Sequence, residues 1–136
     1  MLKNTVARGP NGFVVIVDSI TQLSTDDAGA VVVSGSHGGA SSGEVALQFP
    51  VAAVFFNDAG VGKDNAGIAA LAMLQARGTP AGAIAHTSGR IGDAQDMWDH
   101  GVISHVNDAA RAAGVLPGAA ARTALIALVM NVTGSA

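Results

Sequence analysis

The chain has 136 residues, of which 49% are hydrophobic and only 12% are charged, and its formal net charge is −3. This length fits one domain with a substantial core. Seven Lys and Arg against ten Asp and Glu exclude the strongly basic class of nucleic-acid-binding proteins. The absence of cysteine excludes disulfides and thiolate chemistry and agrees with a cytoplasmic location.

Hydropathy argues against membrane segments. Residues 1–12 are polar and lack the apolar core of a signal peptide. No run approaches the roughly 20 apolar residues that cross a bilayer, so we expect a soluble protein with no membrane partner. The charged share is about half of the typical 25%. Burial of surface between identical subunits explains this low share most simply, and we expect a homo-oligomer.

Apolar runs of strand length alternate with helical patterns along the chain. This alternation predicts a single α/β domain over residues 1–136, with three layers, a mainly parallel sheet of about four to five strands, and helices on both faces. In chain order, the expected elements are a polar lead (1–12), a strand (13–17), a helical turn (20–24), an exposed loop (25–29), a strand (31–33), a helix ended by Phe49-Pro50, a strand (51–56), a helix (66–76), a strand (80–85), a short helix (94–99), a strand (102–103), a helix ending near Ala113 and a final apolar helix (118–130).

Short polar side chains mark the expected helix starts, because their oxygens accept hydrogen bonds from the free N–H groups of the first turn. Glu44 is expected in the first turn of its helix, where the helix dipole favours a carboxylate. Gly78 is the expected stop of the helix over residues 66–76. The candidate N-caps are Ser41 or Ser42, Asp64 or Asn65, Asp93, and Asn107 or Asp108.

Three expected strands run directly into loops of Gly, Ser, Asp, Asn and His, at residues 34–39, 57–65 and 86–93. Successive parallel strands place such loops on one edge of the sheet. In open parallel sheets, ligands bind at this edge. We therefore expect the three loops to surround a single cavity, and this convergence is the main functional signal of the sequence.

The first of these loops favours an anion. Gly38 and Gly39 let backbone N–H groups face a phosphate or carboxylate, and a helix is expected to start soon after them. An ordinary tight turn explains the glycines equally well. Ser36 and His37 lie beside them as candidate ligand contacts. A nucleophile–base pair with His37 is a weaker alternative, because sequence spacing alone is poor evidence for it.

The central loop carries the candidate catalytic residues Asp58 and Lys63 and the candidate ligand contact Asn57. A carboxylate directly after a buried strand is costly unless it is paired or used, although it also serves to accept N–H groups within a turn. Lys63 in such a loop pairs with a substrate anion or, if desolvated, acts as a base or an imine-forming amine; an ordinary surface lysine is the alternative. The GxxxxGK[ST] spacing of a P-loop is absent, which argues against that type of ATP chemistry.

The third loop combines His86, Ser88, Arg90 and Asp93. His86 is suited to proton transfer near neutral pH. Arg90 is suited to clamping a carboxylate through two parallel hydrogen bonds. A satisfied histidine at the edge of the core and a surface ion pair between Arg90 and Asp93 are the alternatives.

No cofactor is predicted. A divalent metal is a weaker alternative, because no candidate ligands show a pair spacing such as HxxxH on a helix. Its ligands would be His37, His86 and His105 with Asp58.

The leading hypothesis is an enzyme that acts on a small anionic metabolite, with a carboxylate, amide or phosphate group, as a hydrolase or lyase. A non-catalytic small-molecule-binding subunit and a purely structural subunit of an oligomer are the alternatives. The predicted catalytic residues are Asp58, Lys63 and His86, and the predicted ligand-binding residues are Ser36, His37, Gly38, Gly39, Asn57, Ser88 and Arg90.

Overall fold

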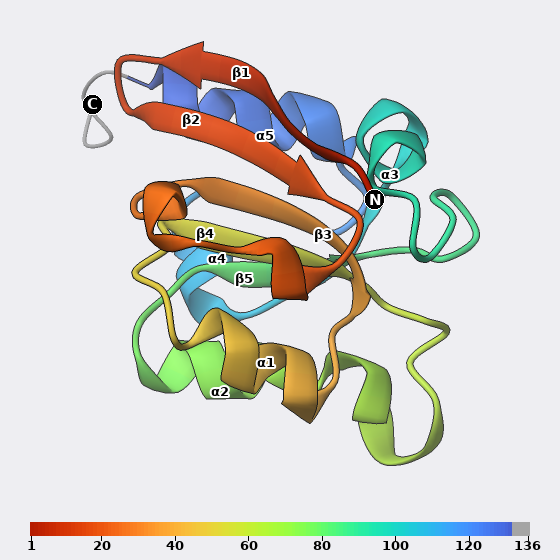
Figure 1. Ribbon diagram of the computed structural model, residues 1–136. Coiled ribbons are helices and arrows are strands. Elements are labelled where there is room, and N and C mark those ends of the chain that lie inside the picture. The colour runs from red at the N-terminus through yellow and green to blue at the C-terminus, as the bar shows by residue number, and fades with distance from the viewer. Residues whose placement is uncertain (132–136) are drawn as a thin grey trace.

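Six strands form one sheet, in which they lie side by side in the order of the chain (Figure 1). The computed structural model describes residues 1–131. Strands β2 to β5 are parallel, whereas β1 pairs antiparallel with β2, and β6 with β5. The prediction of an α/β fold with a mainly parallel sheet is confirmed, with six strands rather than four or five. The strands are β1 (Lys3–Gly9), β2 (Gly12–Val17), β3 (Val31–His37), β4 (Ala53–Asn57), β5 (Ala81–Ile84) and β6 (Ile103–Val106).

Strand β1 lies within residues 1–12, where the sequence predicted only a polar lead, and that prediction was wrong. The strand escapes detection because most of its residues are exposed or half-buried, so no continuous apolar run marks it. It forms a hairpin with β2, and Gly12 adopts φ +132° at the turn, a conformation that favours glycine. The two strands are paired from Lys3 with Val17 to Gly9 with Gly12.

Most expected helices are present. The helix expected over residues 94–99 spans residues 94–100, and the others are shorter than predicted. The final helix begins at residue 121 instead of 118. The expected helix over residues 66–76 is divided into a 3₁₀ segment and an α-helix. The helices are α1 (Ala40–Ala46), α2 (Ala70–Ala76), α3 (Ala94–His100), α4 (Asp108–Ala112) and α5 (Ala121–Met130), with 3₁₀ segments η1 (Ile20–Gln22), η2 (Thr25–Asp27) and η3 (Lys63–Ile68).

Two predicted N-caps are confirmed. The Asp93 side chain accepts a hydrogen bond from the Asp96 N–H at the start of α3, and the Asn107 side chain accepts one from the Ala110 N–H at the start of α4. Gly78 adopts φ +79° just after α2, as expected of a residue that ends a helix.

The N-caps predicted for the first two helices were wrong. Gly39 is the N-cap of α1, so Ser41 and Ser42 lie inside the helix and Glu44 falls beyond its first turn. Asp64 and Asn65 lie within η3 at φ +55° and +59°. Short polar side chains tolerate this left-handed backbone as well as they cap helices, so the sequence signal was ambiguous.

The central strands are buried on both sides, which explains their unbroken apolar runs. Alternate residues enter two separate clusters. The first cluster joins the strands to α3 and α5 and includes Val14, Ile16, Val33, Phe55, Met97, Trp98, Leu125 and Val129. The second joins them to α1 and α2 and includes Val15, Val17, Val32, Val54, Phe56, Ala46, Leu71 and Leu74.

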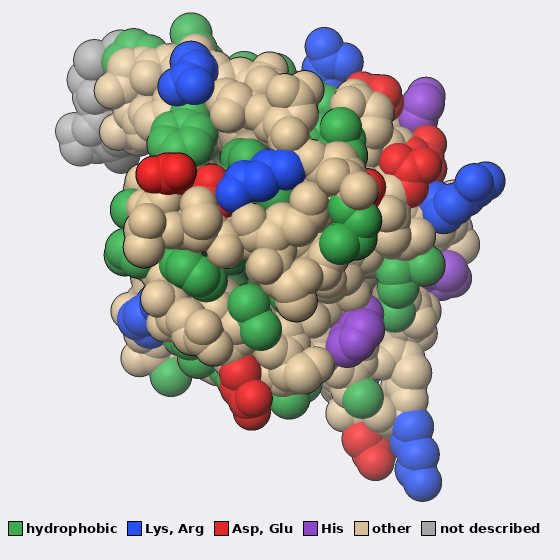
Figure 2. All heavy atoms as spheres, viewed as in Figure 1, with side chains coloured by type: hydrophobic (Ala, Val, Ile, Leu, Met, Phe, Trp, Pro, Cys, Tyr) green, Lys and Arg blue, Asp and Glu red, His purple; other side chains and the backbone are tan. Residues whose placement is uncertain are grey.

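Charged side chains are sparse on the surface, as the low charged share of the sequence predicts (Figure 2). On the face in Figure 2, charged side chains of both signs are scattered in ones and twos. Among residues 1–131, no helix has the length and apolarity needed to span a membrane. The most apolar helix, α5, lies beside β1 and β2 (Figure 1). Its buried Leu125 and Val129 pack into the first cluster, whereas Met130 at its end is half exposed.

The packing of α5 against its own sheet is testable with Leu125→Ala. Removal of this fully buried side chain should lower the free energy of unfolding by about 2–5 kcal/mol. The loss should be the same at low and high protein concentration, because the contacts lie within one chain. Urea unfolding at two concentrations measures this, with the exposed Thr123→Ala on the same helix as control. A loss that grows on dilution would instead place α5 in a subunit interface.

Candidate functional site

The three polar loops contact one another at the carboxyl ends of β3, β4 and β5. The Gly38 N–H donates to the Asn57 carbonyl at 3.0 Å. The Asn57 side-chain amide donates to the Gly89 carbonyl at 2.9 Å. The Gly92 N–H donates to the Gly35 carbonyl at 2.8 Å. The predicted segments therefore lie side by side on one edge of the sheet, because the strands that feed them are parallel.

Asn57, a predicted ligand contact, holds loops together. It is fully buried. Its Oδ1 accepts from the Ala59 N–H at 2.9 Å, and its Nδ2 donates across to the next loop, at Gly89. These bonds use its polar groups inside the protein and direct the side chain beneath the surface.

Asp58 and His86, both predicted catalytic residues, are hydrogen-bonded to each other. The Asp58 Oδ1 lies 3.0 Å from the His86 Nδ1. The same oxygen accepts from the Gly60 N–H at 2.8 Å and the His86 N–H at 3.1 Å. The Asp58 side chain is only 7% exposed, whereas the His86 side chain is 50% exposed. A buried carboxylate thus orients a half-exposed imidazole.

The surroundings of Asp58 favour its charged form. Burial raises the pKa of Asp58. Hydrogen bonds from the Gly60 N–H and from the N–H and ring of His86, together with the influence of Ser104, outweigh burial, so the pKa lies below its usual value of 3.8. A carboxylate can only accept, so the Nδ1 of His86 carries the hydrogen, and the Nε2 of the neutral ring has a free lone pair. That nitrogen is the basic atom of the site.

A cavity of about 340 Å³ adjoins His86 and is lined by the loop that carries it. Arg90 and Asp96 also line it. The Arg90 N–H donates to the Asp96 Oδ2 at 2.8 Å, which fixes the loop to α3, while the Arg90 side chain is exposed. This backbone bond is the largest cause that lowers the pKa of Asp96 below its usual value. The cavity therefore combines a basic nitrogen, a cation and a carboxylate.

Ser88 lines the same cavity, but its hydroxyl is engaged. It donates to the Ala85 carbonyl at 2.8 Å and accepts from the Val102 N–H at 2.9 Å. The hydroxyl hydrogen therefore points at the backbone instead of at His86. The structure places Ser88 beside the candidate base without arranging it as a nucleophile.

In the first loop, the two predicted anion-binding amides are occupied. The Gly38 N–H donates to Asn57, and the Gly39 N–H donates to the Nδ1 of His37 at 3.0 Å. A Cβ on Gly38 would crowd the Gly67 carbonyl, so this glycine permits close packing of two loops. Close packing therefore explains Gly38, and neither the Gly38 nor the Gly39 N–H group is available to bind an anion.

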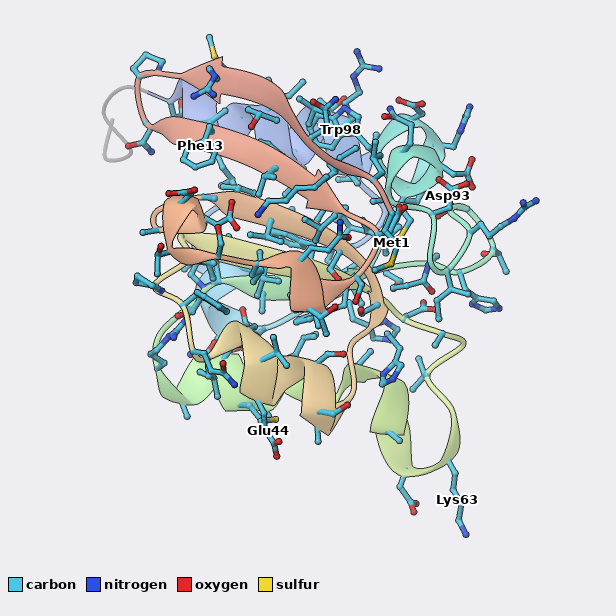
Figure 3. The ribbon with its side chains drawn as sticks, viewed as in Figure 1. Met1, Phe13, Glu44, Lys63, Asp93 and Trp98 are labelled. Atoms are coloured by element: carbon cyan, nitrogen blue, oxygen red, sulfur yellow. The ribbon has the colours of Figure 1, made fainter. Side chains whose placement is uncertain are left out.

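Lys63 stands apart from the other predicted residues. It lies at the tip of the loop after β4, and its side chain points away from the body of the molecule (Figure 3). Val61 adopts φ +69°, which strains a β-branched residue. The structure does not bring Lys63 to the His86 cavity. The residues of this loop with positive φ are Ala59, Gly60, Val61, Gly62, Asp64 and Asn65.

The expectation of one shared cavity was wrong. Residues 86–91 line the cavity beside His86. Another cavity, lined from residues 35–37 and 91–92, takes no lining residue from the loop of residues 57–65. The loops are instead joined to each other by hydrogen bonds, among them those from the Gly38 N–H, the Asn57 amide and the Gly92 N–H.

Within the described part of the chain, residues 1–131, no group of three or more His, Cys, Asp or Glu is arranged to hold a metal ion. His37 and His86 line separate cavities. His105 lies on β6, where its Nδ1 is 2.9 Å from the Ser104 hydroxyl. Of the four candidate metal ligands, Asp58 and His86 are in contact, and no third His or carboxylate joins them within residues 1–131.

Sequence reasoning missed two residues of this site. Asp96 was detectable as a carboxylate four residues before His100 on one helix, since the two side chains are 3.2 Å apart. Ser104 acts on Asp58 from β6, and no local pattern indicates this, because it depends on the pairing of β6 with β5.

Comparison with known proteins gives no relative. No protein-family model matches the chain, and no curated protein or solved structure is similar to it. Evidence on function therefore comes from the geometry of the site.

The lowered pKa of Asp58 predicts a pH-dependent contribution to stability. Because its pKa is below 3.8 in the folded protein, Asp58 stabilises the fold fully above the unfolded pKa, and this contribution is lost as the pH falls through the folded pKa. The difference in free energy of unfolding between wild type and Asp58→Asn should be largest above about pH 5 and should shrink toward about pH 3. Urea unfolding over this range measures it. Asp64→Asn, in the exposed loop, serves as control, and a constant difference for Asp58→Asn would contradict the assignment.

Proposed function

We propose that the protein is an enzyme that acts on a small anionic metabolite, with His86 as its general acid–base. The supporting observation is the 3.0 Å contact between the buried Asp58 Oδ1 and the half-exposed His86 Nδ1. A carboxylate behind an imidazole fixes its tautomer and stabilises the imidazolium that forms during proton transfer. A purely structural pair would have no need to leave Nε2 at an exposed surface beside a cavity.

The proposed chemistry follows from that nitrogen. In hydrolysis, Nε2 accepts a proton from water, the resulting hydroxide adds to the substrate's carbonyl or phosphoryl centre, and the imidazolium returns the proton to the leaving group. In a lyase reaction, Nε2 instead removes a proton from the carbon beside the substrate's carboxylate. The electron pair forms a C=C bond as the substituent on the next carbon leaves, and the imidazolium gives its proton to that leaving group. Water is the proposed nucleophile of the hydrolase, because the Ser88 hydroxyl donates to the Ala85 carbonyl.

Arg90 is the proposed binding group for the substrate's anion. It lines the same cavity as His86, and its side chain reaches solvent there. A guanidinium binds a carboxylate or phosphate through two parallel hydrogen bonds, which also orients the ligand. Lys63 is left out of the proposed machinery, since its side chain points away from the molecule (Figure 3).

The alternative is a non-catalytic binding or structural subunit. It is favoured by the number of predicted ligand groups that are satisfied internally, namely those of Asn57, Ser88, Gly38 and Gly39. In that case the Asp58–His86 pair would only hold two loops together. The tests below separate the two proposals.

Two further proposals concern organisation. We propose three layers, with helices on both faces of the sheet, which the two separate buried clusters support. We also propose a cytoplasmic homo-oligomer. Its support is the low charge of the chain and the exposure of large apolar side chains, including Ile91, Leu116 and Met130.

The catalytic proposal is testable with His86→Gln and Asp58→Asn. Wild type should turn over at least one member of a panel of small carboxylate-bearing esters, amides and phosphate esters. Each variant should then lower kcat/KM by about 10²–10⁴-fold, as expected for loss of general acid–base catalysis. Thr123→Ala, at an exposed position of α5 away from this cavity, should leave turnover unchanged. Ligand binding without turnover by wild type would favour the binding subunit.

Arg90→Gln tests the anion site in a thermal-shift screen with carboxylates, phosphates, amides and divalent metals. A ligand at about 100 times its Kd should stabilise wild type by about 2.7 kcal/mol through mass action. Arg90→Gln should lose this shift, whereas Lys63→Ala should keep it. The reverse pattern would move the anion site to the loop after β4.

A further inference from the structure

A second cavity, of about 470 Å³, lies over the carboxyl ends of β2 and β3. Its volume falls within the range of about 300–1,000 Å³ that is usual for small-molecule sites. No Lys or Arg lines it, and its one carboxylate, Asp18, is engaged by the Leu2 and Ala94 N–H groups at 2.7 and 3.0 Å. Its polar lining is mainly hydroxyl, from Ser19, Thr21, Ser36, Ser41 and Ser42. We call it the hydroxyl-lined cavity.

His37 adds a hydrogen-bond donor to this cavity. Its Nδ1 accepts from the Gly39 N–H at 3.0 Å, so the hydrogen of the neutral ring is on Nε2. The side chain is exposed and lines the cavity. The Ser36 Oγ accepts from the Ile20 N–H at 3.0 Å, which leaves its own hydrogen to donate. The bonds to the Gly39 and Ile20 N–H groups therefore leave the Nε2–H of His37 and the hydroxyl hydrogen of Ser36 available as donors.

Aliphatic side chains form the rest of the wall, from Ile20, Val45 and Ile91. A lining of hydroxyls, one imidazole and aliphatic groups matches a polyhydroxylated carbon chain or ring, whose hydroxyls bond to the polar groups while its C–H groups contact the apolar ones. A charged group would find no compensating charge in this lining. The chemistry therefore favours a neutral, hydroxyl-rich part of a ligand.

The hydroxyl-lined cavity is joined to the His86 cavity by a shared wall. Ile91 lines both. Its neighbour Gly92 donates to the Gly35 carbonyl at 2.8 Å, and a Cβ on Gly35 would overlap the Asp18 carbonyl and crowd Gly92, so the segment is packed closely onto β3. Arg90, just before Ile91, faces the His86 cavity. A cationic site and a neutral, hydroxyl-rich site thus adjoin.

From this arrangement we infer that the substrate is a hydroxylated anion, a sugar acid or a sugar phosphate. Its anionic end binds at Arg90 beside His86, and its hydroxyl-bearing chain occupies the hydroxyl-lined cavity. This inference rests on the proposed function, because it extends the substrate of the same site. The protein would then select this substrate because a ligand without hydroxyl groups leaves the polar groups of the cavity without hydrogen-bond partners.

Isothermal titration calorimetry with matched probes tests the inference. D-Gluconate and hexanoate share a six-carbon chain and one carboxylate but differ in hydroxyls, and sorbitol has the hydroxyls without the charge. D-Glucose 6-phosphate distinguishes a phosphate from a carboxylate end. D-Gluconate or D-glucose 6-phosphate should bind at least tenfold more tightly than both hexanoate and sorbitol. If neither binds more tightly than hexanoate, or neither binds at all, the inference is overturned.

Two variants locate the hydroxyl contacts. Ser41→Leu places a larger apolar side chain at an exposed helical position on the cavity wall. His37→Asn keeps an acceptor for the Gly39 N–H and removes the Nε2–H. Each should weaken binding of the hydroxylated anion about tenfold and leave hexanoate binding unchanged. Thr123→Leu on α5 controls for an added surface leucine.

The outcomes separate this inference from the proposed function. If Arg90→Gln weakens D-gluconate binding while Ser41→Leu and His37→Asn do not, the anion site stands and the inference is overturned. If all three variants weaken binding but His86→Gln leaves turnover unchanged, the ligand class stands and the catalytic proposal fails.

Discussion

The buried carboxylate of Asp58 is the interaction on which the candidate site depends. One of its oxygens accepts from the Gly60 N–H, the His86 N–H and the His86 ring. Such a charge is tolerated inside a protein only with partners of this kind. The same three bonds set the start of the strained loop after β4, the entry to the loop after β5 and the direction of the imidazole. The Asp58 carboxylate thus contributes both to the stability of the loops and to the proposed chemistry of His86.

Most polar groups at this edge of the sheet serve to join loops, and few remain for a ligand. Asn57, Ser88 and the amides of Gly38 and Gly39 are satisfied within the protein. The side chains of His86 and Arg90 remain exposed beside one cavity, and hydroxyl side chains line the other. A buried polar group without a hydrogen-bond partner is costly, so the polar groups between closely packed loops bond to each other and are not left for a ligand.

The fold was largely predictable because burial on both faces leaves an unbroken apolar run in the sequence. The runs 13–17, 31–33 and 51–56 each correspond to a strand of the parallel part of the sheet. Strand β1 was missed because its residues are only partly buried, and its place depends on pairing with β2. The prediction of a helix start succeeded at Asp93, whose side chain caps α3. The same kind of prediction was wrong at Asp64, because a short polar residue tolerates left-handed backbone as well as it caps a helix.

For the site, the sequence predicted the loops that follow parallel strands, and with them the placement of Asp58, His86 and Arg90 on one edge. The contacts between their atoms depend on how distant segments of the chain pack. The hydrogen bond between Asp58 and His86 joins residues 28 positions apart, and Lys63 points away from the body of the molecule (Figure 3). The influence of Ser104 on the pKa of Asp58 depends on the antiparallel pairing of β6 with β5. Local patterns fix the type and order of elements, whereas hydrogen-bond partners and cavities arise from packing between segments distant in the chain, which no local pattern encodes.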